Sequence, residues 1–94
     1  MGNRVYALLN IAYGKSREVA QALKGRPGVV IAEPLEGPPD VIMIVEATER
    51  RELVQLTIQA LDSVETMTEG LLLLDSHADR RSVLSEAFEG REES

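Results

Sequence analysis

The sequence predicts an α+β fold in which a four-stranded antiparallel sheet carries two helices on one face. Apolar, β-favouring runs alternate with two segments of helical spacing, and Gly- and Pro-containing turns separate them. The resulting order is strand, helix, strand, strand, helix, strand, which is the ferredoxin-like βαββαβ plan. We assign residues 1–75 to this domain and residues 76–94 to a carboxyl-terminal tail that is partly helical or disordered.

The first half of the plan occupies residues 5–32. Residues 5–11 are apolar and end at a Tyr-Gly turn, so they predict the first strand. Residues 15–24 have helical spacing, with Ser16 as the expected cap and Gly25 as the stop. Residues 29–32 (VVIA) predict the second strand.

The second half begins after a loop at residues 33–40. Residues 41–47 (VIMIVEA) predict the third strand, and Thr48 is the expected cap of a second helix that runs to Leu61. Residues 66–75 (TMTEGLLLLD) predict the fourth strand, with an irregularity at Gly70.

The third and fourth predicted strands are apolar on both sides. Side chains alternate along a strand, so a strand with apolar residues in both sets requires a cover on each face. Two helices cover one face only, and we expect the other face to pair with a second copy of the chain. The candidate interface residues are Ile42, Ile44, Leu72 and Leu74.

The tail offers an alternative cover for the second face. Val83, Leu84, Ala87 and Phe88 have helical spacing, and Gly90 follows as a stop. One short helix is too small for four strands. We therefore expect a homodimer or larger homo-oligomer, with the tail helix docked at an edge or on a neighbour.

Composition excludes several classes of function. The 94-residue chain has 16 acidic and 10 basic residues, a net charge of -6 and no Trp, which disfavours direct nucleic-acid binding. Its amino-terminal apolar run is too short to span a membrane. The absence of cysteine fits a reducing compartment, and we expect a cytoplasmic protein.

Catalytic and metal-binding patterns are missing from the sequence. The single histidine, His77, follows the fourth predicted strand without a local nucleophile. The acidic pairs Glu49 with Glu52 and Glu92 with Glu93 fit solvated surfaces better than a metal site. No phosphate-binding glycine motif occurs. We predict no catalytic residues, no metal and no cofactor.

The loop Gly37-Pro38-Pro39-Asp40 is the best candidate for a binding site. Its prolines fix two φ angles, so the loop is stiff enough to hold Asp40 ready for the ammonium group of a small ligand. The competing interpretation is ordinary turn chemistry, in which Asp40 satisfies local backbone N–H groups.

These motifs, in this order, resemble the effector-binding domain of the Lrp/AsnC family of transcription regulators. The resemblance covers about residues 5–75 and rests on Pro27-Gly28-Val29, on Gly37-Pro38-Pro39-Asp40, and on Val64 followed by Thr66 and Thr68. It implies a ferredoxin-like fold that pairs into a dimeric α/β barrel, with amino acids bound at contacts between dimers.

Candidate ligand contacts follow from this resemblance: Gly37, Pro39, Asp40, Thr66 and Thr68. Pro39 stands where the family commonly has an aromatic residue. The resemblance also implies a stand-alone effector domain, since full-length members add an amino-terminal helix-turn-helix domain. Such a protein senses an amino acid or a similar metabolite, or modulates a full-length regulator of the family.

Two other classes of function stay open. One is a small enzyme of the dimeric α/β-barrel type, a monooxygenase or isomerase, with a polar cavity inside each barrel. The other is a purely structural assembly module whose loop binds nothing.

Overall fold

The computed structural model describes residues 2–75, and the expectations for the tail helix and for His77 lie outside these residues. The elements follow the predicted order. They are β1 (Asn3–Ile11), α1 (Ser16–Lys24), β2 (Val29–Pro34), β3 (Val41–Ala47), α2 (Arg50–Asp62), a short 3-10 helix η1 (Glu65–Met67) and β4 (Thr68–Asp75).

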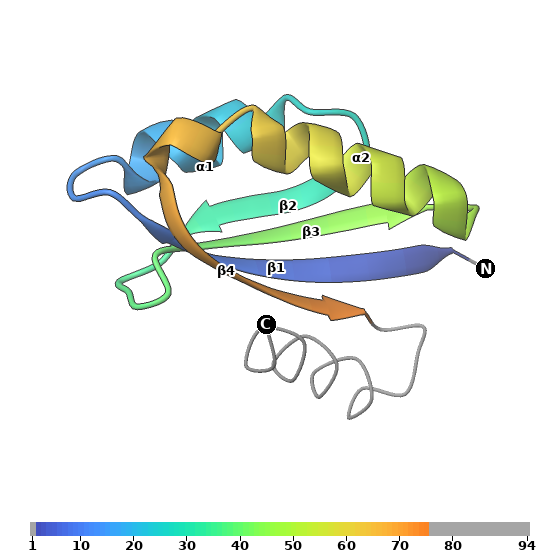
Figure 1. Cartoon of the computed structure of the whole chain (residues 1–94), viewed down its shortest axis with the longest axis horizontal. Helices are drawn as coiled ribbons and strands as arrows, with labels where there is room; N and C mark the ends of the chain where they lie inside the picture. The colour runs from blue at the N-terminus through green and yellow to red at the C-terminus, as the bar shows by residue number, and fades with distance from the viewer. Residues whose placement is uncertain (1, 76–94) are drawn as a thin grey trace, which may run out of the picture.

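The strands form one antiparallel sheet in the order β2-β3-β1-β4, which confirms the ferredoxin-like plan. Both helices lie on the same side of the sheet (Figure 1). The central strand β3 pairs with β1 along its whole length, from Ala47 opposite Asn3 to Val41 opposite Leu9. The edge strands are therefore β2 and β4.

The core lies between the sheet and the helices. Alternate residues of β1 and β3 point into it and meet one stripe from each helix. Its fully buried large side chains are Leu9, Val19, Leu23, Val41, Met43, Val45, Leu53 and Val64. The sheet-facing stripe of α2 includes the predicted Leu53, Thr57 and Ala60, and Thr57 donates its hydroxyl to the Leu53 carbonyl at 2.7 Å.

Both predicted helix caps are wrong by one residue. Ser16 is the first residue of α1, and Lys15 occupies the N-cap position with its carbonyl accepting the Val19 N–H at 2.9 Å. Glu49 rather than Thr48 precedes α2, because the Glu49 carbonyl accepts the Leu53 N–H at 2.9 Å. Neither N-cap side chain makes a capping hydrogen bond.

The predicted irregularity at Gly70 is confirmed as a bulge in β4. Asn10 pairs with Gly70 whereas Ile11 pairs with Thr68, so Glu69 is the extra residue. A Cβ at Gly70 would lie 2.9 Å from the Asn10 Nδ2 atom. The glycine therefore lets the Asn10 amide lie close against β4.

The turn between α1 and β2 generates a stability prediction. Gly28 has φ +83°, and a Cβ there would lie 2.6 Å from Cδ1 of Leu56. Gly28→Ala should therefore lower the free energy of unfolding by about 1–3 kcal/mol, measured by urea denaturation. Gly25→Ala is the matched control, because its Cβ would meet only the Ala22 carbonyl oxygen at 4.0 Å. Equal stability of the two variants would contradict this account of Gly28.

Candidate functional site

The face of the sheet turned away from α1 and α2 is apolar. Because Ala7, Leu9, Met43 and Val45 point into the core, their neighbours along β1 and β3 point the other way. We call this second surface the outer face. Its apolar side chains are Tyr6, Leu8, Ile31, Ile42, Ile44, Leu72 and Leu74.

These side chains form rows across the strands. Ile31, Ile44, Tyr6 and Leu74 are successive partners in one row, and Ile42, Leu8 and Leu72 are successive partners in the next. All four predicted interface residues, Ile42, Ile44, Leu72 and Leu74, therefore share the outer face. Their role in pairing two copies stays a prediction.

A polar group borders one end of the outer face. Arg4 forms an ion pair with Glu46 on the neighbouring strand and donates a hydrogen bond to the Tyr6 hydroxyl at 3.2 Å. The hydrogen bonds with Tyr6 and Glu46 raise the pKa of the Arg4 guanidinium above its ordinary value. This end of the face is consequently charged, whereas the two rows beside it are apolar.

The loop before β3 is organised around Asp40. Its carbonyl accepts the Leu35 N–H at 2.6 Å, and its own N–H donates to the Leu9 carbonyl at 2.8 Å. Its carboxylate Oδ2 accepts the Ile11 N–H at 2.7 Å. A Cβ at Gly37 would lie 2.1 Å from Asp40 Oδ1, so a larger residue there would displace this carboxylate. The Asp40 carboxylate therefore has a structural partner, and this partner is the backbone of β1 rather than a local N–H group of the turn.

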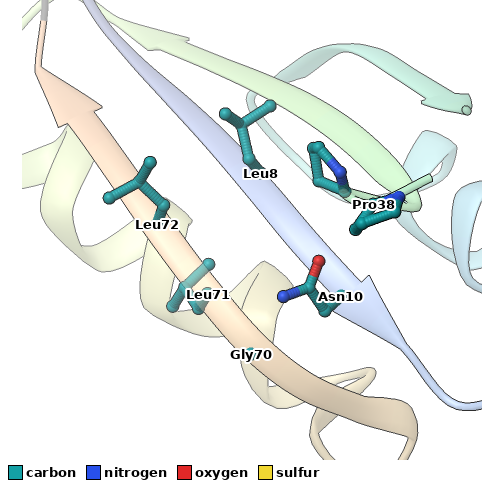
Figure 2. A pocket seen from close by; sticks show the side chains of 7 residues that line it. Leu8, Asn10, Pro38, Gly70, Leu71 and Leu72 are labelled. Atoms are coloured by element: carbon teal, nitrogen blue, oxygen red, sulfur yellow. The ribbon is translucent and has the colours of Figure 1, made fainter.

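The same loop forms one wall of a hollow at the border of the outer face. The hollow has a volume of about 400 Å³. Figure 2 shows that its side chains come from β1, β4 and the proline loop. Its lining residues are Leu8, Asn10, Pro38, Pro39, Gly70, Leu71 and Leu72. We call it the proline hollow. Asn10 supplies its only polar side chain.

The predicted ligand contacts are placed differently with respect to this hollow. Pro39 lines it, whereas Gly37 and Asp40 belong to the same loop but not to the lining. Thr66 lies in η1, and the Thr68 hydroxyl donates to the Val64 carbonyl at 2.8 Å. Neither threonine lines the proline hollow. That they bind a ligand held between two subunits stays a prediction.

Sequence reasoning missed Asn10. It is a single amide within an otherwise apolar run (VYALLNI), and such a residue in a predicted strand is a usable signal. Its partner in the ladder, Gly70, leaves space for the amide. Asn10 is therefore the side chain best placed to form a hydrogen bond with a molecule in the hollow.

Within residues 2–75, no group of three or more histidine, cysteine, aspartate or glutamate side chains comes together as a metal site. No helix in that part of the chain is long and apolar enough to cross a membrane. The lining of the proline hollow offers apolar contacts and one neutral hydrogen-bonding side chain, that of Asn10.

Neither a protein-family model nor a curated protein sequence matches the chain. Solved structures share its fold. The hypothetical protein PHS023 from Pyrococcus horikoshii is 23% identical with a TM-score of 0.71, and the match covers 82% of this chain and 92% of that one. AsnC of E. coli is 10% identical with a TM-score of 0.67, covering 82% of this chain and 52% of that one.

A third similar structure is the transcriptional regulator NMB0573 of Neisseria meningitidis in complex with L-Met. It is 16% identical with a TM-score of 0.60, and the match covers 78% of this chain and 48% of that one. A putative antibiotic biosynthesis monooxygenase from Bacteriodes thetaiotaomicron also matches, at 15% identity and a TM-score of 0.56 over 80% of this chain and 87% of that one. At these identities the likeness shows a shared fold.

The Asp40 hydrogen bond generates a second stability prediction. Asp40→Ala leaves the Ile11 N–H without its acceptor, which should lower the free energy of unfolding by about 1–3 kcal/mol. Asp40→Asn keeps an acceptor oxygen and should retain most of the stability. The measurement is chemical denaturation of both variants beside the parent chain. If Asp40→Ala were as stable as the parent, the carboxylate would not be holding the loop to β1.

Proposed function

We propose that this protein is a non-enzymatic small-molecule-binding domain of the Lrp/AsnC effector type, which assembles through the outer face of its sheet. One observation carries the proposal: a continuous apolar sheet face with a preformed hollow at its border. The fold shared with AsnC and with the L-Met-bound regulator supports it. The match to nearly all of PHS023 shows that this fold also occurs as a chain of similar length.

Assembly through the outer face follows from its two apolar rows. Ile44 is already buried, at 7% exposure, whereas Ile31 is exposed and the other side chains of these rows are partly exposed. Each Å² of this remaining apolar area that a partner buries contributes roughly 25 cal/mol. A second copy offers an identical apolar face, and isologous pairing is the commonest form of homo-oligomer. Pairing of the two sheets produces the dimeric α/β barrel implied by the family resemblance.

Pairing would also change the proline hollow. In a single chain the hollow is open to solvent, but a second sheet packed on the outer face covers the side to which Leu8 and Leu72 point. A ligand held there makes apolar contacts and one hydrogen bond with Asn10. Binding and assembly are therefore linked, because the same surface serves both.

An amino-acid ligand makes further demands on the site. Its ammonium and carboxylate groups need charged or backbone partners, and the lining of the hollow in one chain contains no charged side chain. Asp40 follows the prolines in the loop and its Oδ2 already accepts the Ile11 N–H, so in this proposal the second subunit supplies the remaining charged groups. An amino acid or related metabolite bound between subunits is the ligand class that we propose.

The enzyme alternative is favoured only by the fold shared with the monooxygenase. A barrel enzyme needs a general base or a cofactor-binding group in its cavity. Asn10 is the only polar side chain that the proline hollow provides. The described residues therefore favour binding over catalysis.

The assembly is tested by Leu72→Asp. A carboxylate buried in a packed apolar interface costs several kcal/mol, so the variant should shift the sedimentation profile from oligomer toward monomer. Tyr13→Asp is the control, because this side chain is fully exposed in the turn after β1. Circular dichroism of both variants separates dissociation from unfolding. A folded Leu72→Asp protein with the sedimentation profile of the parent would contradict assembly through the outer face.

Ligand binding is tested by thermal shift against the twenty amino acids and related metabolites, with light scattering on the same samples. A ligand at a hundred times its dissociation constant adds about 2.7 kcal/mol to the folded state, which raises the melting temperature measurably. Asn10→Ala should reduce the response to any ligand held in the hollow. No response across the panel, with a stable oligomer throughout, would favour the purely structural module.

A further inference from the structure

A second apolar hollow lies on the helix side of the sheet, away from the outer face. It is a groove of about 340 Å³ between α2 and the edge strand β4. Its apolar lining comes mainly from Val5, Val54, Ile58, Leu61 and Leu73. We call it the α2–β4 groove. Leu74 also lines it and is the one side chain that the groove shares with the outer face.

The groove exists because the two helices do not cover all four strands. In Figure 1, α1 and α2 lie over the part of the sheet formed by β2, β3 and β1, and β4 extends the sheet beyond them. On the helix side of β4, Leu73 lines the groove and is only partly buried, although it pairs with the fully buried Ala7. Among residues 2–75, no helix lies above β4.

Helix α2 itself carries two apolar stripes. Leu53, Thr57 and Ala60 face the core and are buried. Val54, Ile58 and Leu61 recur at spacings of four and three residues and form the wall of the groove. Val54 is 46% exposed and Ile58 is 53% exposed. A helix with a second apolar stripe is suited to a second helical neighbour.

We propose that the chain's own tail, residues 76–94, fills the α2–β4 groove as an amphipathic helix. The groove begins where the described chain ends, because Asp75, the last residue of β4, lines it beside Arg50. Val83, Leu84, Ala87 and Phe88 fall within about 140° of one another on a helix, which matches an apolar groove.

The lengths of the segments are compatible with this docking. The seven residues 76–82 can extend over about 23 Å, enough for the chain to reverse direction after β4. The groove wall from Val54 to Leu61 is about 10 Å long, and a helix from Val83 to Phe88 covers about 7.5 Å of it. The docked helix then lies beside α2, over β1 and β4, and completes the helix layer.

The test uses thiol reactivity, because the chain contains no cysteine. Ile58→Cys places a thiol in the groove, and Gln59→Cys places one on the exposed side of the same helix. In the full-length protein, a disulfide reagent such as 5,5′-dithiobis(2-nitrobenzoate) should modify Cys at position 58 at least tenfold more slowly than Cys at position 59. Adding Leu84→Asp and Phe88→Asp should abolish this difference by raising the rate at position 58 alone.

Each other outcome overturns the proposal. Equal rates at the two positions with the native tail mean that nothing covers the groove. A slow rate at position 58 that survives the tail substitutions means that another element covers it. Protection that disappears on dilution assigns the cover to a second copy. If the tail substitutions instead raise the rate of Leu72→Cys, the tail lies on the outer face.

Discussion

The whole structure depends on one constraint: the central strands β1 and β3 are apolar on both faces. One set of their side chains, including Ala7, Leu9 and Met43, is buried beneath the helices. The other set, including Leu8 and Ile42, has no helix above it among residues 2–75. A two-helix fold of this size can build only one core, so the second apolar set is available for association.

The loop before β3 shows how a structural requirement and a binding surface share the same residues. Asp40 connects this loop to the end of β1 through Leu9 and Ile11. With its base fixed in this way, the loop presents its two prolines at the border of the outer face. Asp40 can therefore be essential for the hollow without touching a ligand. Loss of binding in an Asp40 variant has to be interpreted together with its stability.

Much of this arrangement was predictable from local patterns. The alternation in VIMIVEA places Ile42 and Ile44 on one face, and the structure agrees. The helix starts were less predictable, because the N-cap position depends on backbone geometry rather than on residue type. Ser16 and Thr48 have the preferred side chains, yet Lys15 and Glu49 occupy these positions.

The site was harder to predict because its contacts connect distant parts of the chain. The hydrogen bond between Asp40 and Ile11 joins residues 29 positions apart, and no local spacing indicates it. Asn10 enters the hollow because a bulge opposite it places Gly70 at its side. Such a contact depends on the strand register. Hydrophobic alternation alone does not determine the register, because a shift of two residues keeps the same side chains on the same face.

The edge strand β4 separates the two surfaces that the helices leave open. Its alternation directs Leu72 toward the outer face and Leu73 toward the α2–β4 groove. A cover on one side therefore leaves the other side accessible, so a second copy and a helix from the chain's own tail can occupy both surfaces at once. In the proposed assembly the apolar residues of β4 that neither α1 nor α2 reaches have a cover on each side, and an edge strand that would otherwise favour aggregation is part of an interface.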